Sequence, residues 1–115
     1  MSFAAGSIVT VHLIQPSEKF LGVLERLEPV GVIYRGISLD SFEDWINELS
    51  RREGSSLGLA TMFVPLFRVE RIFLDEQVGE VESYGQRLER RTGLSARALL
   101  GLLDAAGGAG GELPS

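Results

Sequence analysis

The sequence predicts a mainly β protein: a small, strongly bent five-stranded barrel with one inserted helix and a short helical C-terminal extension. Three observations predict it. Segments with an apolar residue at every second position recur along the chain and indicate pleated strands. Glycine and proline interrupt these segments, which favours bends and tight turns over flat strands. Between residues 40 and 52 the apolar spacing changes to that of a helix.

The first three strands come from the N-terminal third of the chain. Residues 7–15 alternate between two faces and predict the first strand. Residues 20–27 form the second, in which Gly22 permits a sharp bend or a close approach of another backbone. A Pro-x-Gly turn at residues 29–31 then reverses the chain into a third strand that starts at residue 32.

An amphipathic helix is predicted over residues 40–52, between the third and fourth strands. Its apolar residues share one face: Phe42, Trp45, Ile46 and Leu49. We expect Asp40 to cap the helix, Glu43 to occupy the capping-box position and Gly54 to stop it. Packing onto the barrel or onto a neighbour explains the aromatic residues better than a ligand platform does, so we expect Trp45 to be at least half buried.

Two further strands follow the helix. The fourth covers residues 60–64 and carries no charge. Pro65 should lie at a strand end, at a bulge or on an edge strand, because proline cannot donate to a ladder. The fifth runs over residues 69–74 and is apolar enough on both faces that we expect it to be largely covered. Asp75 and Glu76 end it, and as strand neighbours they point to opposite faces, which opposes joint acid-base work.

The chain after residue 78 predicts two short helices. Ser83 can cap the first, which carries Tyr84 and Leu88 on one face, and Gly93 suits the left-handed position after it. A second helix is expected from Ser95. We therefore assign residues 1–78 to the barrel with its helix insert, residues 79–106 to a helical extension and the glycine-rich residues 107–115 to a flexible tail.

The composition limits the classes of function. The chain has 115 residues, a net charge of −5 and no cysteine, which predicts one domain without disulfides or thiolate metal sites. The negative charge disfavours a broad nucleic-acid surface, because such binding depends on Lys and Arg neutralising phosphates. No apolar run is long enough to span a bilayer and the N-terminus lacks a secretory pattern, so we expect a cytoplasmic protein with no membrane partner.

No set of residues indicates catalysis, a metal or a cofactor, and we expect a non-enzymatic protein. His12 is the single histidine and has no evident catalytic partner. Asp40, Glu43 and Asp44 are explained by helix capping better than by a cation site. The basic residues near the C-terminus predict a solvated helix face with mixed ion pairs rather than a phosphate site: Arg87, Arg90, Arg91 and Arg97, among Glu80, Glu82 and Glu89.

Two segments resemble the motifs of the Sm-like protein family. Residues 22–35, GVLERLEPVGVIYR, are similar to the first Sm motif of the bacterial Hfq branch, with a glycine, an apolar residue two positions on, an apolar-acidic pair before the turn and an apolar strand ending in a basic residue. Residues 62–76, MFVPLFRVERIFLDE, are similar in placement to the second motif. The resemblance implies an SH3-like barrel that forms a homo-oligomeric ring of about five to seven subunits.

The resemblance also implies RNA binding, but the residues that carry it in the family are absent. Val30 and Gly31 stand where the family holds a base, and Pro-Leu-Phe at residues 65–67 stands where Hfq carries Tyr-Lys-His. We therefore expect RNA binding to be weak. The alternative is an Hfq-like RNA-binding protein whose contacts have moved to other positions, with four candidates: Tyr34, Arg35, Phe67 and Arg68.

The first hypothesis is an assembly or protein-interaction scaffold that joins copies of itself, with a protein or peptide as a further partner of its helices. A bent five-stranded sheet leaves its fourth and fifth strands with unpaired main-chain groups at their outer edges. Joining the fourth strand of one copy to the fifth of the next would satisfy both edges. The candidate interface residues are Met62, Phe63, Val64, Val69, Arg71 and Ile72.

Overall fold

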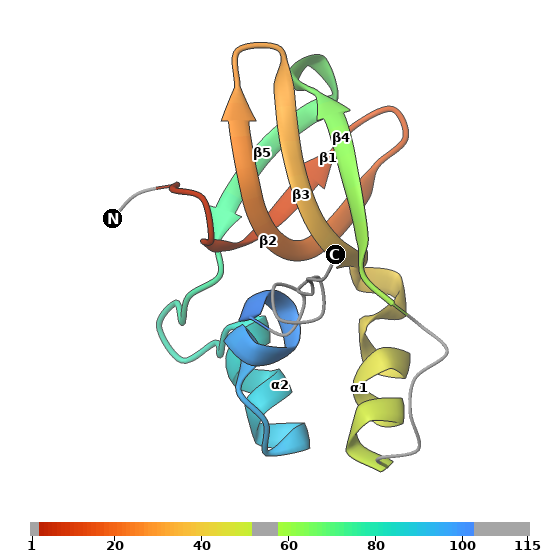
Figure 1. The fold of residues 1–115 in the computed structure, drawn as a ribbon, viewed down its shortest axis with the longest axis vertical. Coiled ribbons are helices and arrows are strands. Elements are labelled where there is room, and N and C mark those ends of the chain that lie inside the picture. Colours follow the sequence, from red (N-terminus) through yellow and green to blue (C-terminus); the bar gives the residue numbers. More distant parts are fainter. Residues whose placement is uncertain (1–2, 52–57, 103–115) are drawn as a thin grey trace, which may run out of the picture.

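The protein is a single open β-sheet with helices packed at one end, as seen in a computed structural model that describes residues 3–51 and 58–102 (Figure 1). The strands are β1 (Ile8–Leu13), β2 (Glu18–Glu28), β3 (Gly31–Ser38), β4 (Ala60–Pro65) and β5 (Val69–Leu74). All pairs are antiparallel and the order is β4-β3-β2-β1-β5, so β4 and β5 are the two edges. The predicted mainly β fold with five strands is confirmed, and the sheet is not closed.

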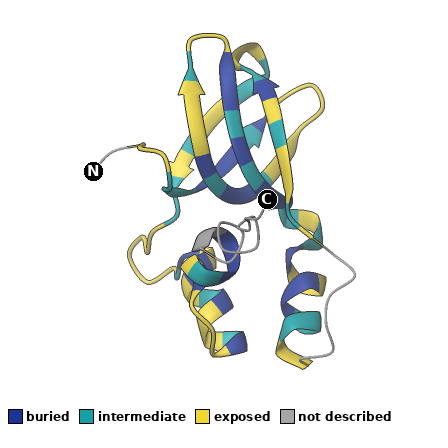
Figure 2. Ribbon diagram, in the orientation of Figure 1, coloured by how far each residue is buried: buried dark blue, intermediate teal, exposed yellow. Residues whose placement is uncertain are grey.

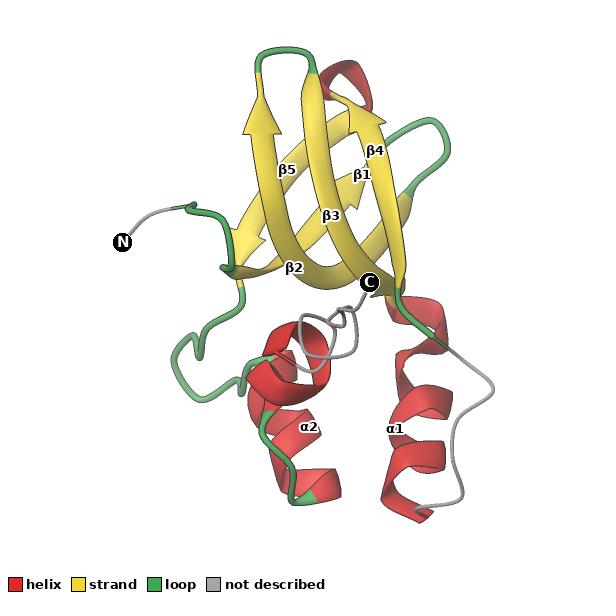
Figure 3. Ribbon diagram, in the orientation of Figure 1, coloured by secondary structure: helices red, strands yellow, loops and turns green. Residues whose placement is uncertain are grey.

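The long strand β2 curves along the sheet, where it lies between β1 and β3 (Figure 3). Its register against β3 shifts between Leu24 and Arg26, which marks a bulge. Gly22 lies opposite Gly36 of β3, and a Cβ on Gly22 would stand 2.5 Å from the carbonyl oxygen of Arg35. The close backbone approach predicted at Gly22 is therefore confirmed, because no larger residue fits there.

Figure 2 shows buried positions along the strands and on the helices. Buried hydrophobic residues form two clusters. One is made by the strands alone: Val9, Val11, Leu13, Leu24, Val32, Tyr34 and Val64. The other joins β2 and β3 to the helices: Leu21, Ile37, Phe42, Trp45, Ile46, Leu88, Ala96, Leu99 and Leu100. Because the second cluster draws on both the helix insert and the C-terminal helices, these predicted segments share one core with the sheet.

Helix α1 (Phe42–Arg51) confirms the predicted insert between β3 and β4. Trp45 is only 4% exposed, as its spacing predicts. The predicted cap is wrong: a 3-10 turn, η1 (Leu39–Ser41), precedes the helix, and its Asp40 N–H donates to the Ser38 hydroxyl at 3.2 Å. Ser38 therefore caps this entry. The predicted last residue at 52 and the stop at residue 54 lie outside the described residues.

Helix α2 (Tyr84–Thr92) is capped at both ends as the sequence predicts. The Ser83 hydroxyl accepts from the Gln86 N–H at 3.0 Å, and the Gln86 side chain accepts from the Ser83 N–H at 2.7 Å. Gly93 follows the helix in the left-handed conformation, with φ at 74°. The N-terminal box and the C-terminal glycine together fix the bounds of α2.

The second C-terminal helix, predicted from Ser95, is present: residues 96–97 are helical and continue into a π-helical turn, η3 (Ala98–Leu102). The Ser95 hydroxyl accepts from the Ala98 N–H at 3.3 Å. Leu99 and Leu100 are buried in the cluster that α1 and the sheet share, so the C-terminal segment docks on its own chain. The end of the predicted extension, residues 103–106, and the predicted tail, residues 107–115, lie outside the described residues.

Strand β5 has the predicted bounds but is not largely covered. Its register against β1 shifts between His12 and Leu13, which leaves Glu70 as an extra residue. The shift places Val69 and Ile72 together against the core, whereas Phe73 stays 46% exposed. Strict alternation along residues 69–74 would put Val69 on the same face as Phe73, but the bulge changes the face of every residue that follows it.

Candidate functional site

The outer edge of β4 carries main-chain groups that no other strand of the described chain pairs with. β4 pairs with β3 on its other side. Directly after β4, the Leu66 N–H donates to the Val30 carbonyl at 3.0 Å, so residues 66 and 30 are a hydrogen-bonded pair. Along an antiparallel ladder, such pairs alternate with pairs that are not hydrogen-bonded. The main chain at Val64 therefore faces β3, whereas the main chain at Thr61 and Phe63 faces away from the sheet.

Strand β5 has a corresponding edge on its side away from β1. The Asp75 N–H donates to the Ile8 carbonyl at 2.9 Å, so residues 75 and 8 are a hydrogen-bonded pair. Every second pair of the β1–β5 ladder from there is therefore hydrogen-bonded as well. The main chain at Phe73 therefore faces β1, whereas the main chain at Ile72 and Leu74 faces outward. The two edges of the sheet thus offer donors and acceptors of the same spacing.

The predicted interface residues divide by where their side chains lie. Four pack on the core of their own chain: Met62, Val64, Val69 and Ile72. Arg71 is exposed, and Phe63 is 52% exposed. The Val69 N–H donates to the Leu66 carbonyl and closes the 3-10 turn η2 (Leu66–Arg68), so this amide is already used. Phe63 is therefore the candidate that presents apolar surface at an edge.

An apolar groove, here called the seam groove, lies on the core side of β5, between the end of β2 and the turn η2. It has a volume of about 360 Å³ and is lined by Phe3, Leu27, Glu28, Leu66, Val69 and Ile72. Leu27 is half exposed, and Phe3 and Leu66 also expose large apolar surfaces. No local pattern in the sequence indicates this groove, because its residues come from three distant segments that only the sheet topology brings together.

Tyr34, a predicted RNA contact, is fully buried in the strand cluster, so the prediction is wrong for this residue. Its ring packs against Phe20 with centroids 5.8 Å apart. Its hydroxyl is buried without a hydrogen-bond partner among the described residues. Burial raises the pKa of Tyr34 to about 12, so the phenol stays neutral across the physiological range.

The other predicted RNA contacts differ in their surroundings. Arg68 donates to two main-chain carbonyls of the β1–β2 turn, at 2.9 and 2.8 Å, and to the carboxylate of Glu18 at 3.1 Å. Arg35 donates to the hydroxyl of Thr61 at 3.0 Å. Phe67 is 80% exposed. Both arginines thus stabilise the strands around them, and Phe67 is the candidate whose ring faces solvent.

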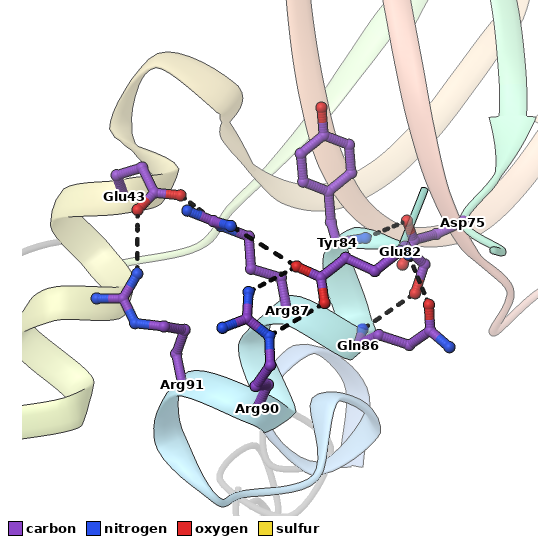
Figure 4. A network of polar contacts seen from close by, with 9 residues as sticks. Glu43, Asp75, Glu82, Tyr84, Gln86, Arg87, Arg90 and Arg91 are labelled. Carbon is purple, nitrogen blue, oxygen red and sulfur yellow. Dashed lines mark hydrogen bonds and ion pairs between the residues drawn. The ribbon is translucent and has the colours of Figure 1, made fainter. Parts of the chain in front are cut away.

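The arginines of α2 form ion pairs that link this helix to α1 and to the preceding loop (Figure 4). Arg87 donates to Glu43 at 2.6 Å, Arg90 donates to Glu82 at 2.7 Å, and Arg91 also reaches Glu43, at 3.3 Å. The hydrogen bond from Arg87 lowers the pKa of Glu43, and that from Arg90 lowers the pKa of Glu82. The predicted mixed ion pairs are confirmed for Glu82 in the loop before α2, and Glu43 of α1 is a further acidic partner.

Asp75 has a structural role that sequence analysis missed. Its carboxylate accepts from the N–H of Tyr84 at 2.8 Å and from the N–H of Gly85 at 2.7 Å (Figure 4). A carboxylate at a helix N-terminus satisfies unpaired amides and interacts favourably with the helix dipole. Asp75 therefore ties the end of β5 to the start of α2.

Other chemistry finds little support in the part of the chain that the structure describes. These residues contain no group of three or more His, Cys, Asp or Glu side chains suited to a metal ion. His12 packs edge-on against Phe73 with ring centroids 5.1 Å apart, and burial lowers its pKa. Over residues 3–51 and 58–102, no helix combines the length and apolarity needed to cross a membrane. The strand edges and the seam groove are the candidate functional site, because they offer main-chain groups at the sheet edges and exposed apolar surface beside them.

Comparisons of this chain with protein-family models, with curated proteins and with solved structures found no match. The resemblance of residues 22–35 and 62–76 to the Sm motifs thus remains a proposal.

Proposed function

We propose that this protein is a non-enzymatic Sm-like module that joins copies of itself into a ring and serves as an assembly scaffold. The observation that carries the proposal is the strand order β4-β3-β2-β1-β5, which leaves β4 and β5 at the two edges of an open sheet. The Sm-like resemblance supports pairing of these two strands between copies. Such a contact joins different surfaces, so it closes into a ring when the rotation per copy permits.

The composition of the two edges supports the same proposal. Soluble proteins usually protect exposed strand edges with charges, proline or a bulge. β4 reads ATMFVP, without any charge, and its proline stands only at the end. On β5 the outward-facing main chain belongs to Ile72 and Leu74, beyond the bulge at Glu70. β4 is thus an uncharged edge, and the outward main chain of β5 lies at two apolar residues, so pairing with a complementary strand would stabilise both.

The first prediction is that the protein is an oligomer at micromolar concentration. Light scattering coupled to size-exclusion chromatography should give a mass of about five to seven times the 12.5 kDa of the chain. Thr61→Pro should weaken assembly because it removes an amide that faces outward from β4. Thr61→Ala is the matched control, because it loses the same hydroxyl and keeps the amide. A wild-type mass of 12.5 kDa would contradict the proposal.

The second candidate function is an RNA-binding protein with relocated contacts, which the exposure of Phe67 favours because bases stack on exposed aromatic rings. We predict that this binding is weak, since the net charge is −5 and Arg68 is held by its own chain. Fluorescence anisotropy with U-rich and A-rich oligonucleotides at physiological salt measures it, with Phe67→Ala as the comparison. Submicromolar, sequence-selective binding that Phe67→Ala abolishes would favour the RNA function instead.

A further inference from the structure

Phe63 and the seam groove are both apolar, but within one chain the Phe63 ring does not line the groove. The Phe63 ring lies over Gly31, where it fills the space that a Cβ would need, and it remains 52% exposed. The residues that line the seam groove do not include Phe63. Phe63 lies on the edge strand β4, and the groove lies beside the edge strand β5. Pairing β4 of one copy with β5 of the next therefore brings Phe63 of the first copy close to the groove of the second.

The pleat of the strands determines which residue of β4 can reach the groove. Directly opposite residues of an antiparallel pair project their side chains to the same face. The residues of β4 whose main chain faces outward are Thr61 and Phe63. On β5, the main chain of Ile72 faces outward and the side chain of Ile72 lines the groove. Pairing Phe63 of one copy with Ile72 of the next therefore directs the Phe63 ring to the groove side.

We propose that Phe63 of each copy inserts its ring into the seam groove of the next copy, opposite Ile72, an inference that rests on the edge-to-edge assembly proposed above. The groove, at about 360 Å³, is larger than the roughly 150 Å³ apolar cavity that holds benzene in a well-studied case. Met62 and Val64 cannot take this role, because they pack on the core of their own chain. An aromatic anchor in an apolar pocket is the usual source of interface affinity.

The lining of the groove favours β4 of a second copy over a charged peptide. Glu28 is the one charged residue in the lining, and its carboxylate is paired with Arg26. The rim adds the outward main chain of β5, which requires an extended strand as its partner. β4 provides an uncharged strand edge and an exposed aromatic ring in the same six residues.

Disulfide cross-linking tests the contact directly, because the chain contains no cysteine. Chains with Phe63→Cys are mixed with chains with Leu27→Cys and oxidised mildly, and we expect a disulfide-linked heterodimer. The control pairs Phe63→Cys with Val78→Cys, a residue that is 67% exposed and does not line the groove. Equal yields from the two pairs would overturn the inference.

Substitution separates this inference from the assembly itself. Phe63→Ser should weaken association at least tenfold, whereas Phe73→Ser, at a similarly exposed phenylalanine outside the groove, should have a much smaller effect. Leu27→Trp, which fills the groove, should act like Phe63→Ser. Mixing these two weakened variants should restore one contact and give dimers, because one keeps its groove and the other keeps its ring.

The outcomes distinguish the two proposals. A wild-type chain that is monomeric at micromolar concentration refutes the assembly and the insertion of Phe63 together. A wild-type oligomer whose Phe63→Ser variant is folded and assembles with unchanged affinity refutes the insertion alone. If Phe63→Ser does not fold, the Leu27→Trp variant and the cross-linking yields decide.

Discussion

Trp45→Ala is expected to lower the free energy of unfolding by about 3–5 kcal/mol. Trp45 is 4% exposed and belongs to the cluster that joins α1 to the sheet and to the C-terminal helices. Removing the indole leaves a cavity bordered by all three, and the cost grows with the part of that cavity that does not collapse. Urea unfolding followed by circular dichroism measures the change without depending on tryptophan fluorescence.

Asp44→Ala is the matched control, because Asp44 neighbours Trp45 in α1 and is exposed. A surface substitution of this kind usually changes stability by less than about 0.5 kcal/mol. Equal unfolding midpoints for Trp45→Ala and the wild type would show that α1 is a detached arm and not part of the core.

Elements with strong local signals were predictable from the sequence. The apolar spacing of Phe42, Trp45 and Ile46 defines a helix face that the structure buries. Ser83 and Gly93 mark the two ends of α2, because capping depends on residue types within a few positions. These features depend on contacts between residues that are close in sequence, so a local sequence pattern predicts them.

Features that depend on distant contacts were not predictable in the same way. The bulge at Glu70 appears only when β5 is paired with β1, and it changes which residues face the core. Tyr34 is a candidate RNA contact from the sequence alone, yet its side chain is buried in the cluster that residues of β1, β2, β3 and β4 form together. The seam groove joins Leu27 to Leu66, whose separation along the chain leaves no local signal.

Gly36→Ala is expected to lower the free energy of unfolding by about 1–3 kcal/mol or more. A Cβ on Gly36 would stand 2.8 Å from the Cα of Gly22 and closer still to the carbonyl oxygen of Leu21. These are main-chain atoms of β2, so no side chain can rotate away to make room. The two strands cannot separate freely either, since Leu21 packs on the helices while Leu24 packs within the sheet.

The control for this prediction is Gly58→Ala, because a Cβ there meets no atom within 4 Å. At such a position alanine is neutral or stabilises by about 0.4–1 kcal/mol, through the lower conformational entropy of the unfolded chain. Gly22→Ala combined with Gly36→Ala should cost less than the two single changes together, since both added carbons crowd the same close approach of β2 to β3 and one displacement accommodates both. Thermal and urea unfolding of the four variants measures this. Matching midpoints for Gly36→Ala and Gly58→Ala would show that β2 and β3 can move apart at little cost, and that their close approach does not maintain the bend.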